Sequence, residues 1–164
     1  MTRTPAFDVS RLSNATRILL GGGVLLLIDS FLTWQRDCPS LAGVEPSCTN
    51  VHSMWGGSGA VFGVLAGILL LAMLAWEGLR VANVSVDVGV TVDAAKVSAY
   101  VGLGVLAMVL IKFIFVLTNA ALGAWLGLVL ALAIGYGAWM RLQEPAEPLP
   151  PAPPTSNGGM TNAR

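Results

Sequence analysis

Four long apolar runs, each close to twenty residues, constrain this chain more than any other feature. A helix needs about 20 apolar residues to cross the roughly 30 Å hydrocarbon core of a bilayer. Only 11% of the residues are charged, whereas a soluble domain carries about 25%. Because so few charges cannot cover a water-facing surface, the runs predict membrane-spanning helices.

The predicted fold is an all-α membrane protein, a bundle of four transmembrane helices within residues 15–142. The spans are expected at about 15–34, 55–76, 99–118 and 122–140. Only a few residues separate the last two spans, so these helices should be antiparallel neighbours. One alternative makes the first span a cleaved signal peptide, but "FLTWQRD" offers no small-x-small cleavage site.

The connecting segments divide between the two sides of the membrane. Residues 1–14 form an N-terminal segment, 35–54 an outer loop and 77–98 an inner loop. The tail 143–164 is rich in Pro, Gly and Ser and is predicted to be disordered. In the inner loop, valine alternates with other residues over 84–92, which is typical of a strand that packs on the membrane, the bundle or a partner.

The distribution of positive charge predicts that both termini are cytoplasmic. Four spans place the two termini on one side, and cytoplasmic loops are enriched in Lys and Arg. The basic residues on the terminal side are Arg3, Arg11, Arg17, Arg80, Lys96, Arg141 and Arg164. The opposite side holds Arg36 alone. Tryptophans near the span ends fit interfacial anchors: Trp34, Trp55, Trp76, Trp125 and Trp139. Because arginine outnumbers lysine and Ala, Gly and Val are abundant, we expect a bacterial plasma membrane protein.

The two cysteines, Cys38 and Cys48, both lie in the predicted outer loop. A disulfide persists on that oxidising side, and closing so small a ring would stabilise the loop by about 2–3 kcal/mol. The spacing lacks the C-x-x-C pattern of thiol oxidoreductases, so the disulfide is expected to be structural. The single His52 adds too few ligands for a zinc site, and no metal is expected.

Small residues recur every fourth position in the second and fourth spans. They are Gly59, Gly63 and Gly67, and then Gly123, Gly127, Ala131 and Gly135. Each set predicts a smooth ridge where helix backbones approach closely. The ridges serve either packing within one bundle or an oligomer interface, and hydropathy does not separate these two interpretations.

Two charged residues, Asp29 and Lys112, interrupt the first and third spans. At about 1.5 Å per residue, both lie roughly 7–9 Å below the predicted outer ends of their helices. Unpaired charges at this depth are costly, so we expect an Asp29–Lys112 pair between neighbouring spans. The alternatives are a snorkelling Lys112 with a protonated Asp29, or a water-filled cavity.

The four spans, the "FLTW" end of the first span and "LGAWLGLVLALAIGYGAWMRL" resemble small actinobacterial four-span membrane proteins of uncharacterised function. The resemblance covers most of residues 15–142. It implies a bundle fold and no particular activity or site residue.

No catalytic or cofactor motif and no basic patch with interleaved aromatics is apparent in the sequence. We therefore expect a non-enzymatic membrane scaffold or accessory subunit without a cofactor, and no binding to nucleic acid. Its partners would be the lipid bilayer and either another copy or another membrane protein. The alternative is a small transporter or an ion- or proton-conducting oligomer that uses Asp29 and Lys112. A thiol-redox enzyme is a third hypothesis.

Overall fold

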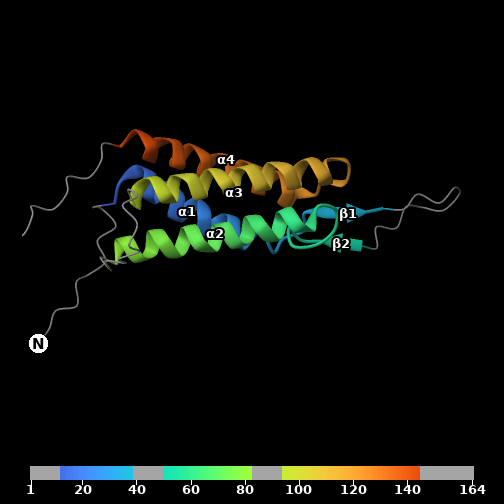
Figure 1. The fold of residues 1–164 in the computed structure, drawn as a ribbon. Helices are drawn as coiled ribbons and strands as arrows, with labels where there is room; N and C mark the ends of the chain where they lie inside the picture. The colour runs from blue at the N-terminus through green and yellow to red at the C-terminus, as the bar shows by residue number, and fades with distance from the viewer. Residues whose placement is uncertain (1–11, 39–49, 83–93, 145–164) are drawn as a thin grey trace, which may run out of the picture.

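The computed structural model describes residues 12–38, 50–82 and 94–144. Within them, four helices run side by side in alternating directions, and a short hairpin extends from one end of the bundle (Figure 1). We call this end the hairpin end. The start of α1 (Asn14–Asp29) and the end of α4 (Leu122–Gln143) both lie at the opposite end (Figure 1).

Three of the helices are long and apolar enough to cross a membrane. They are α2 (Ala60–Val81), α3 (Ala94–Val116), which continues into the 3-10 turn η2 (Leu117–Asn119), and α4. Their 22–23 residues span about 33–35 Å. The described helices therefore support a membrane protein.

The first helix is shorter than predicted. Ser13 starts α1, because its Oγ accepts a hydrogen bond from the backbone N–H of Thr16 at 3.2 Å. The helix ends at Asp29 instead of near residue 34, because the backbone turns at Ser30, whose Oγ donates to Leu27 O at 2.6 Å. At 16 residues, α1 spans only about 24 Å.

The second helix begins later than the predicted residue 55. Gly57 and Gly59 have positive φ angles of 69° and 68°, which glycine adopts without steric cost. These two residues keep the chain out of helical geometry until Ala60. By contrast, α4 starts at Leu122 as predicted.

The helices form a ring in the order α1, α2, α3, α4. Both α1 and α3 pack mainly against α2 and α4, which places α1 and α3 on a diagonal. All four helices meet around Gly102 of α3, where an added Cβ would contact Ala138, Leu19 and Met73. Large apolar side chains on the outside of the ring stay exposed, including Ile28, Ile68, Ile114 and Val129.

A two-stranded antiparallel sheet, absent from the sequence expectations, projects from the hairpin end. Strand β1 (Gln35–Asp37) pairs with β2 (Asn50–His52), with Gln35 opposite His52 and Asp37 opposite Asn50. A bridge from Gln35 to Ala120 joins the sheet to the turn before α4. The predicted valine strand over 84–92, and almost all of the predicted tail over 143–164, lie outside the described residues.

Candidate functional site

Lys112, near the hairpin end of α3, is fully buried in the bundle. Its Nζ donates hydrogen bonds to the backbone carbonyl oxygens of Gly56 at 2.7 Å and Ser58 at 2.6 Å. Both carbonyls belong to the irregular segment that leads into α2. The lysine therefore ties α3 to this segment, which folds back against the bundle.

Gln35 of β1 holds the same segment from its other side. Its Oε1 accepts from the backbone N–H of Ser58 at 2.9 Å, and its Nε2 donates to Asp37 at 2.8 Å. A side chain on Gly57 would collide with Gln35 Oε1 and with His52. As a result, the hairpin, the segment before α2 and Lys112 form one connected polar cluster at the hairpin end.

The predicted Asp29–Lys112 pair does not form, because α1 and α3 are diagonal rather than neighbouring helices. Asp29 is only 4% exposed, and neither carboxylate oxygen has a hydrogen-bond partner within the described residues. Its Oδ2 lies over Gly127 of α4, next to the indole of Trp34. The indole N–H donates to the backbone carbonyl of Asp29 at 3.0 Å.

The glycine ridges lie inside the bundle, where they receive bulky groups from the turns. A Cβ at Gly67 would collide with the indole of Trp55, and a Cβ at Gly127 with that of Trp34. Gly63 and Gly123 instead make room for backbone carbonyls, those of Met54 and Thr33. The ridges thus seat turn residues against the helices more than they join helix to helix.

Two members of these ridges form a helix–helix contact and a helix cap. Gly135 of α4 accommodates Leu106 of α3, and the buried Ala131 lies one turn before it. Gly59 is the residue before α2 and carries a positive φ, so it is not part of a helical ridge. Trp34 was expected to anchor at the interface but is fully buried, whereas Trp125 and Trp139 are more than half exposed.

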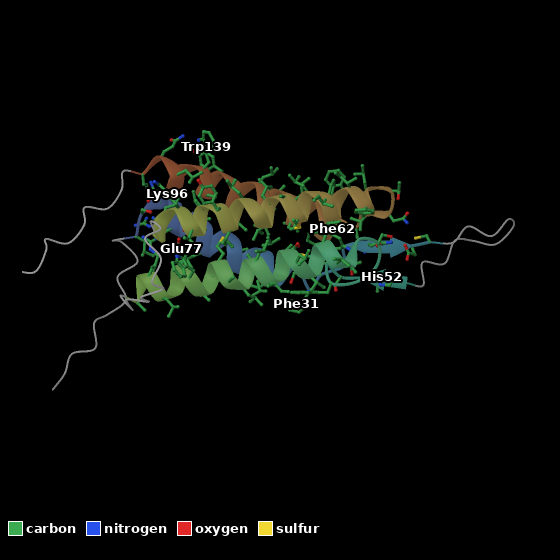
Figure 2. All side chains as sticks on the ribbon, in the orientation of Figure 1. Phe31, His52, Phe62, Glu77, Lys96 and Trp139 are labelled. Atoms are coloured by element: carbon green, nitrogen blue, oxygen red, sulfur yellow. The ribbon has the colours of Figure 1, made fainter. Side chains whose placement is uncertain are left out.

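A second polar cluster, which the sequence did not predict, surrounds Glu77 near the opposite end of the bundle, where Figure 2 labels this residue. Glu77 of α2 is 1% exposed and lies 3.8 Å from Nη2 of Arg141 of α4 and 3.4 Å from Nη1 of Arg80. Arg141 is itself only 6% exposed. This buried ion pair joins α2 to α4.

Arg141 also reaches the beginning of α1. Its Nη1 donates to Ser13 Oγ and Thr16 Oγ1, each at 3.1 Å, and forms an ion pair with Glu144 at 2.7 Å. Three helices therefore converge on one guanidinium. The sequence does contain a signal for this ion pair. Glu77 and Arg141 lie in the last turns of the second and fourth predicted spans, which run in the same direction, so the two residues are expected at similar depth.

Cys38 and His52, two residues of the predicted outer loop, lie at the hairpin. Cys38 directly follows β1, while Cys48 lies outside the described residues, so the disulfide stays a prediction. His52 is on β2, and its Nε2 lies 3.5 Å from Asp37 Oδ2 across the sheet. In the segments that the structure describes, no three His, Cys, Asp or Glu side chains gather as a metal site would need.

Comparison with known proteins finds no family model, no curated protein and no solved structure that matches this chain. The resemblance to small actinobacterial four-span proteins therefore stays a prediction.

Proposed function

We propose that the chain is an integral protein of a bacterial plasma membrane in which all four helices cross the bilayer. Although α1 is short, the backbone that follows it is hydrogen-bonded within the protein: the N–H of Leu32 donates to Asp29 O at 2.9 Å, and the N–H of the buried Trp34 donates to His52 O at 2.8 Å. Irregular backbone is tolerated at membrane depth where protein buries it. The excess of basic residues on the other side supports cytoplasmic termini and an external hairpin.

Fusions to alkaline phosphatase, which is active only after export, test this orientation. A fusion placed after Asp37 should be active and one placed after Glu144 should be inactive. The reverse pattern, or two fusions of equal activity, would contradict an external hairpin.

Within the membrane, we propose a non-enzymatic scaffold or accessory subunit that presents the hairpin to a partner. The observation that carries this proposal is that the buried Lys and Arg side chains bond to other groups of the same chain. Lys112 holds the segment before α2, and Arg141 holds Glu77 and the start of α1. Both clusters fasten the ends of the bundle.

The middle of the bundle supports the same function. Apart from Asp29 at the end of α1 and Ser98 near the start of α3, the buried residues of the helices between the two clusters are Ala, Gly, Val, Leu, Ile or Met. Examples are Leu26, Leu70, Val109 and Ile134. Since proton and ion pathways need intramembrane polar groups, this apolar layer favours a structural role.

Site-specific photocrosslinking in cells tests the proposed presentation of the hairpin. Val51 on β2 is 61% exposed, and Val129 on the outer face of α4 is 64% exposed. With a photoreactive residue in place of each valine, a discrete adduct of one other protein, or of a second copy, should form at position 51. Position 129 is the matched control and should give lipid adducts only. The scaffold proposal fails if neither position gives a protein adduct.

A second candidate, an ion- or proton-conducting oligomer, is favoured by Asp29, whose buried carboxylate has no partner among the described residues. Proton flux into liposomes that contain the purified protein tests it. Flux that disappears with Asp29→Asn would support conduction and contradict the scaffold. Flux no greater than that of empty liposomes would contradict conduction.

A further inference from the structure

Among the residues that the structure describes, two carboxyl groups are buried, and they differ in the cations that lie near them. Glu77 is 1% exposed and has two arginine side chains within ion-pair distance. Asp29 is 4% exposed, and both of its carboxylate oxygens lack a hydrogen-bond partner within the described residues. Since both groups are removed from water, their partners decide whether each can carry a negative charge.

The immediate surroundings of Asp29 do not favour a negative charge. It is the last residue of α1, where the helix dipole is already negative. Its Oδ2 faces Gly127 and the indole of Trp34. The indole N–H is engaged by the backbone carbonyl of Asp29, and so is the backbone N–H of Leu32 at 2.9 Å.

The ionisable groups on the elements around Asp29 do not compensate its charge either. Those toward the opposite end of the bundle are Arg17, Glu77, Arg80, Lys96, Tyr100, Tyr136 and Arg141. Those on the hairpin are Arg36, Asp37 and His52, of which Asp37 and His52 face each other. The remaining cation of the four helices, Lys112, donates to Gly56 and Ser58 instead.

We infer that Asp29 is a proton-binding site, occupied at neutral pH, so that the side chain is a neutral carboxylic acid within the bundle. Unpaired charge in an apolar interior is costly enough that such groups neutralise by taking up a proton. Glu77 differs from Asp29 because the side chains of Arg80 and Arg141 lie within ion-pair distance of it. The inference rests on the geometry of the described residues and is independent of the scaffold proposal.

Infrared spectroscopy of the purified protein in lipid tests this inference, because the C=O stretch of a protonated carboxyl is separate from the bands of a carboxylate. At pH 7 the wild type should show the protonated band, and Asp29→Asn should lose it. Asn closely matches the shape of the neutral acid, so this variant should fold, which circular dichroism checks. Raising the pH should convert the wild-type band to a carboxylate band.

Glu77→Gln is the matched control, since it removes the other buried carboxyl and should leave the protonated band unchanged. The inference is overturned if the wild type shows no protonated carboxyl at pH 7. It is equally overturned if the band persists in Asp29→Asn or disappears in Glu77→Gln.

Discussion

Lys112 donates hydrogen bonds to backbone carbonyls that have no partner within a helix or a sheet. The carbonyls of Gly56 and Ser58 lie in a segment without helix or sheet hydrogen bonds at those oxygens, and they receive the lysine Nζ. In a bilayer every buried backbone polar group must find a partner in the protein. A long side chain with three donors on a neighbouring helix supplies it.

Replacing Lys112 with Met should therefore loosen the segment before α2. The two carbonyls would lose charge-assisted hydrogen bonds, each worth about 1.5–3 kcal/mol, offset in part by removal of a buried charge. Amide hydrogen exchange of residues 53–59 should accelerate by about tenfold or more. Lys96→Met, which changes an exposed lysine on the same helix, is the control. Equal exchange in both variants would show that Lys112 does not hold this segment.

Gly127 is a position where a single added methyl group should disturb the packing at the hairpin end. A Cβ there would collide with Trp34 and approach Asp29 Oδ2 to 2.8 Å. Gly127→Ala should lower the free energy of unfolding by about 1–3 kcal/mol through overpacking. At Gly21 a Cβ would meet nothing within 4 Å, so Gly21→Ala should cause no loss. Denaturation in detergent micelles measures both, and equal stability of the two variants would contradict the packing described for Trp34.

At the scale of elements, one arginine side chain joins the ends of three helices through an ion pair and hydrogen bonds. Arg141 of α4 contacts Glu77 of α2 and the residues Ser13 and Thr16 that start α1. The N-terminal turn of α1 lies beside this guanidinium. The hydroxyl oxygens of Ser13 and Thr16 accept hydrogen bonds from it. The contact fixes where α1 begins relative to its neighbours.

Removing Arg141 alone should destabilise the bundle more than removing the pair. Arg141→Met leaves Glu77 buried with only Arg80 nearby, which should cost about 3–5 kcal/mol. In the Arg141→Met, Glu77→Gln double variant much of that loss should be recovered. Arg36→Met, a change to an exposed arginine on β1, should have little effect. A double variant no more stable than Arg141→Met would argue against an energetic coupling of the two side chains.

The pairing of β1 with β2 also bears on the two cysteines. Asp37 lies opposite Asn50, so the chain segments that lead to Cys38 and Cys48 leave the sheet from adjacent positions. We predict that neither thiol reacts with an alkylating reagent until the protein is reduced, after which mass spectrometry should find two labels per chain. Labelling of the unreduced protein would exclude the disulfide. Cys38→Ser serves as the control and should expose one thiol.

At the scale of the whole molecule, hydropathy predicted much of the fold. Apolar length found α4 to within a few residues and indicated α2 and α3. It overextended α1, because the run from residue 15 to 34 stays apolar after the helix has turned at Ser30. Hydropathy also could not predict which helices are neighbours, since lipid and protein interior are equally apolar.

The polar clusters were less predictable for two physical reasons. Lys112 donates to backbone carbonyls whose positions depend on the positive φ angles of Gly57 and Gly59. Because every residue has a backbone carbonyl, the sequence does not indicate which of them the lysine contacts. Glu77 and Arg141 occupy the last turns of their helices, where charges usually face the aqueous side. Their burial becomes apparent only in the structure, where α2, α4 and the start of α1 meet at this end.

The buried charges of the bundle secure its two ends separately and do not pair across its diagonal. A double-mutant cycle of Asp29→Asn and Lys112→Met, measured as free energies of unfolding in micelles, tests this most directly. Because the two side chains do not touch, the changes in the free energy of unfolding should add to within about 0.5 kcal/mol. If the free energy of unfolding of the double variant departs from the sum of the two single changes by about 1 kcal/mol or more, Asp29 and Lys112 interact, and the buried charges do pair across the diagonal.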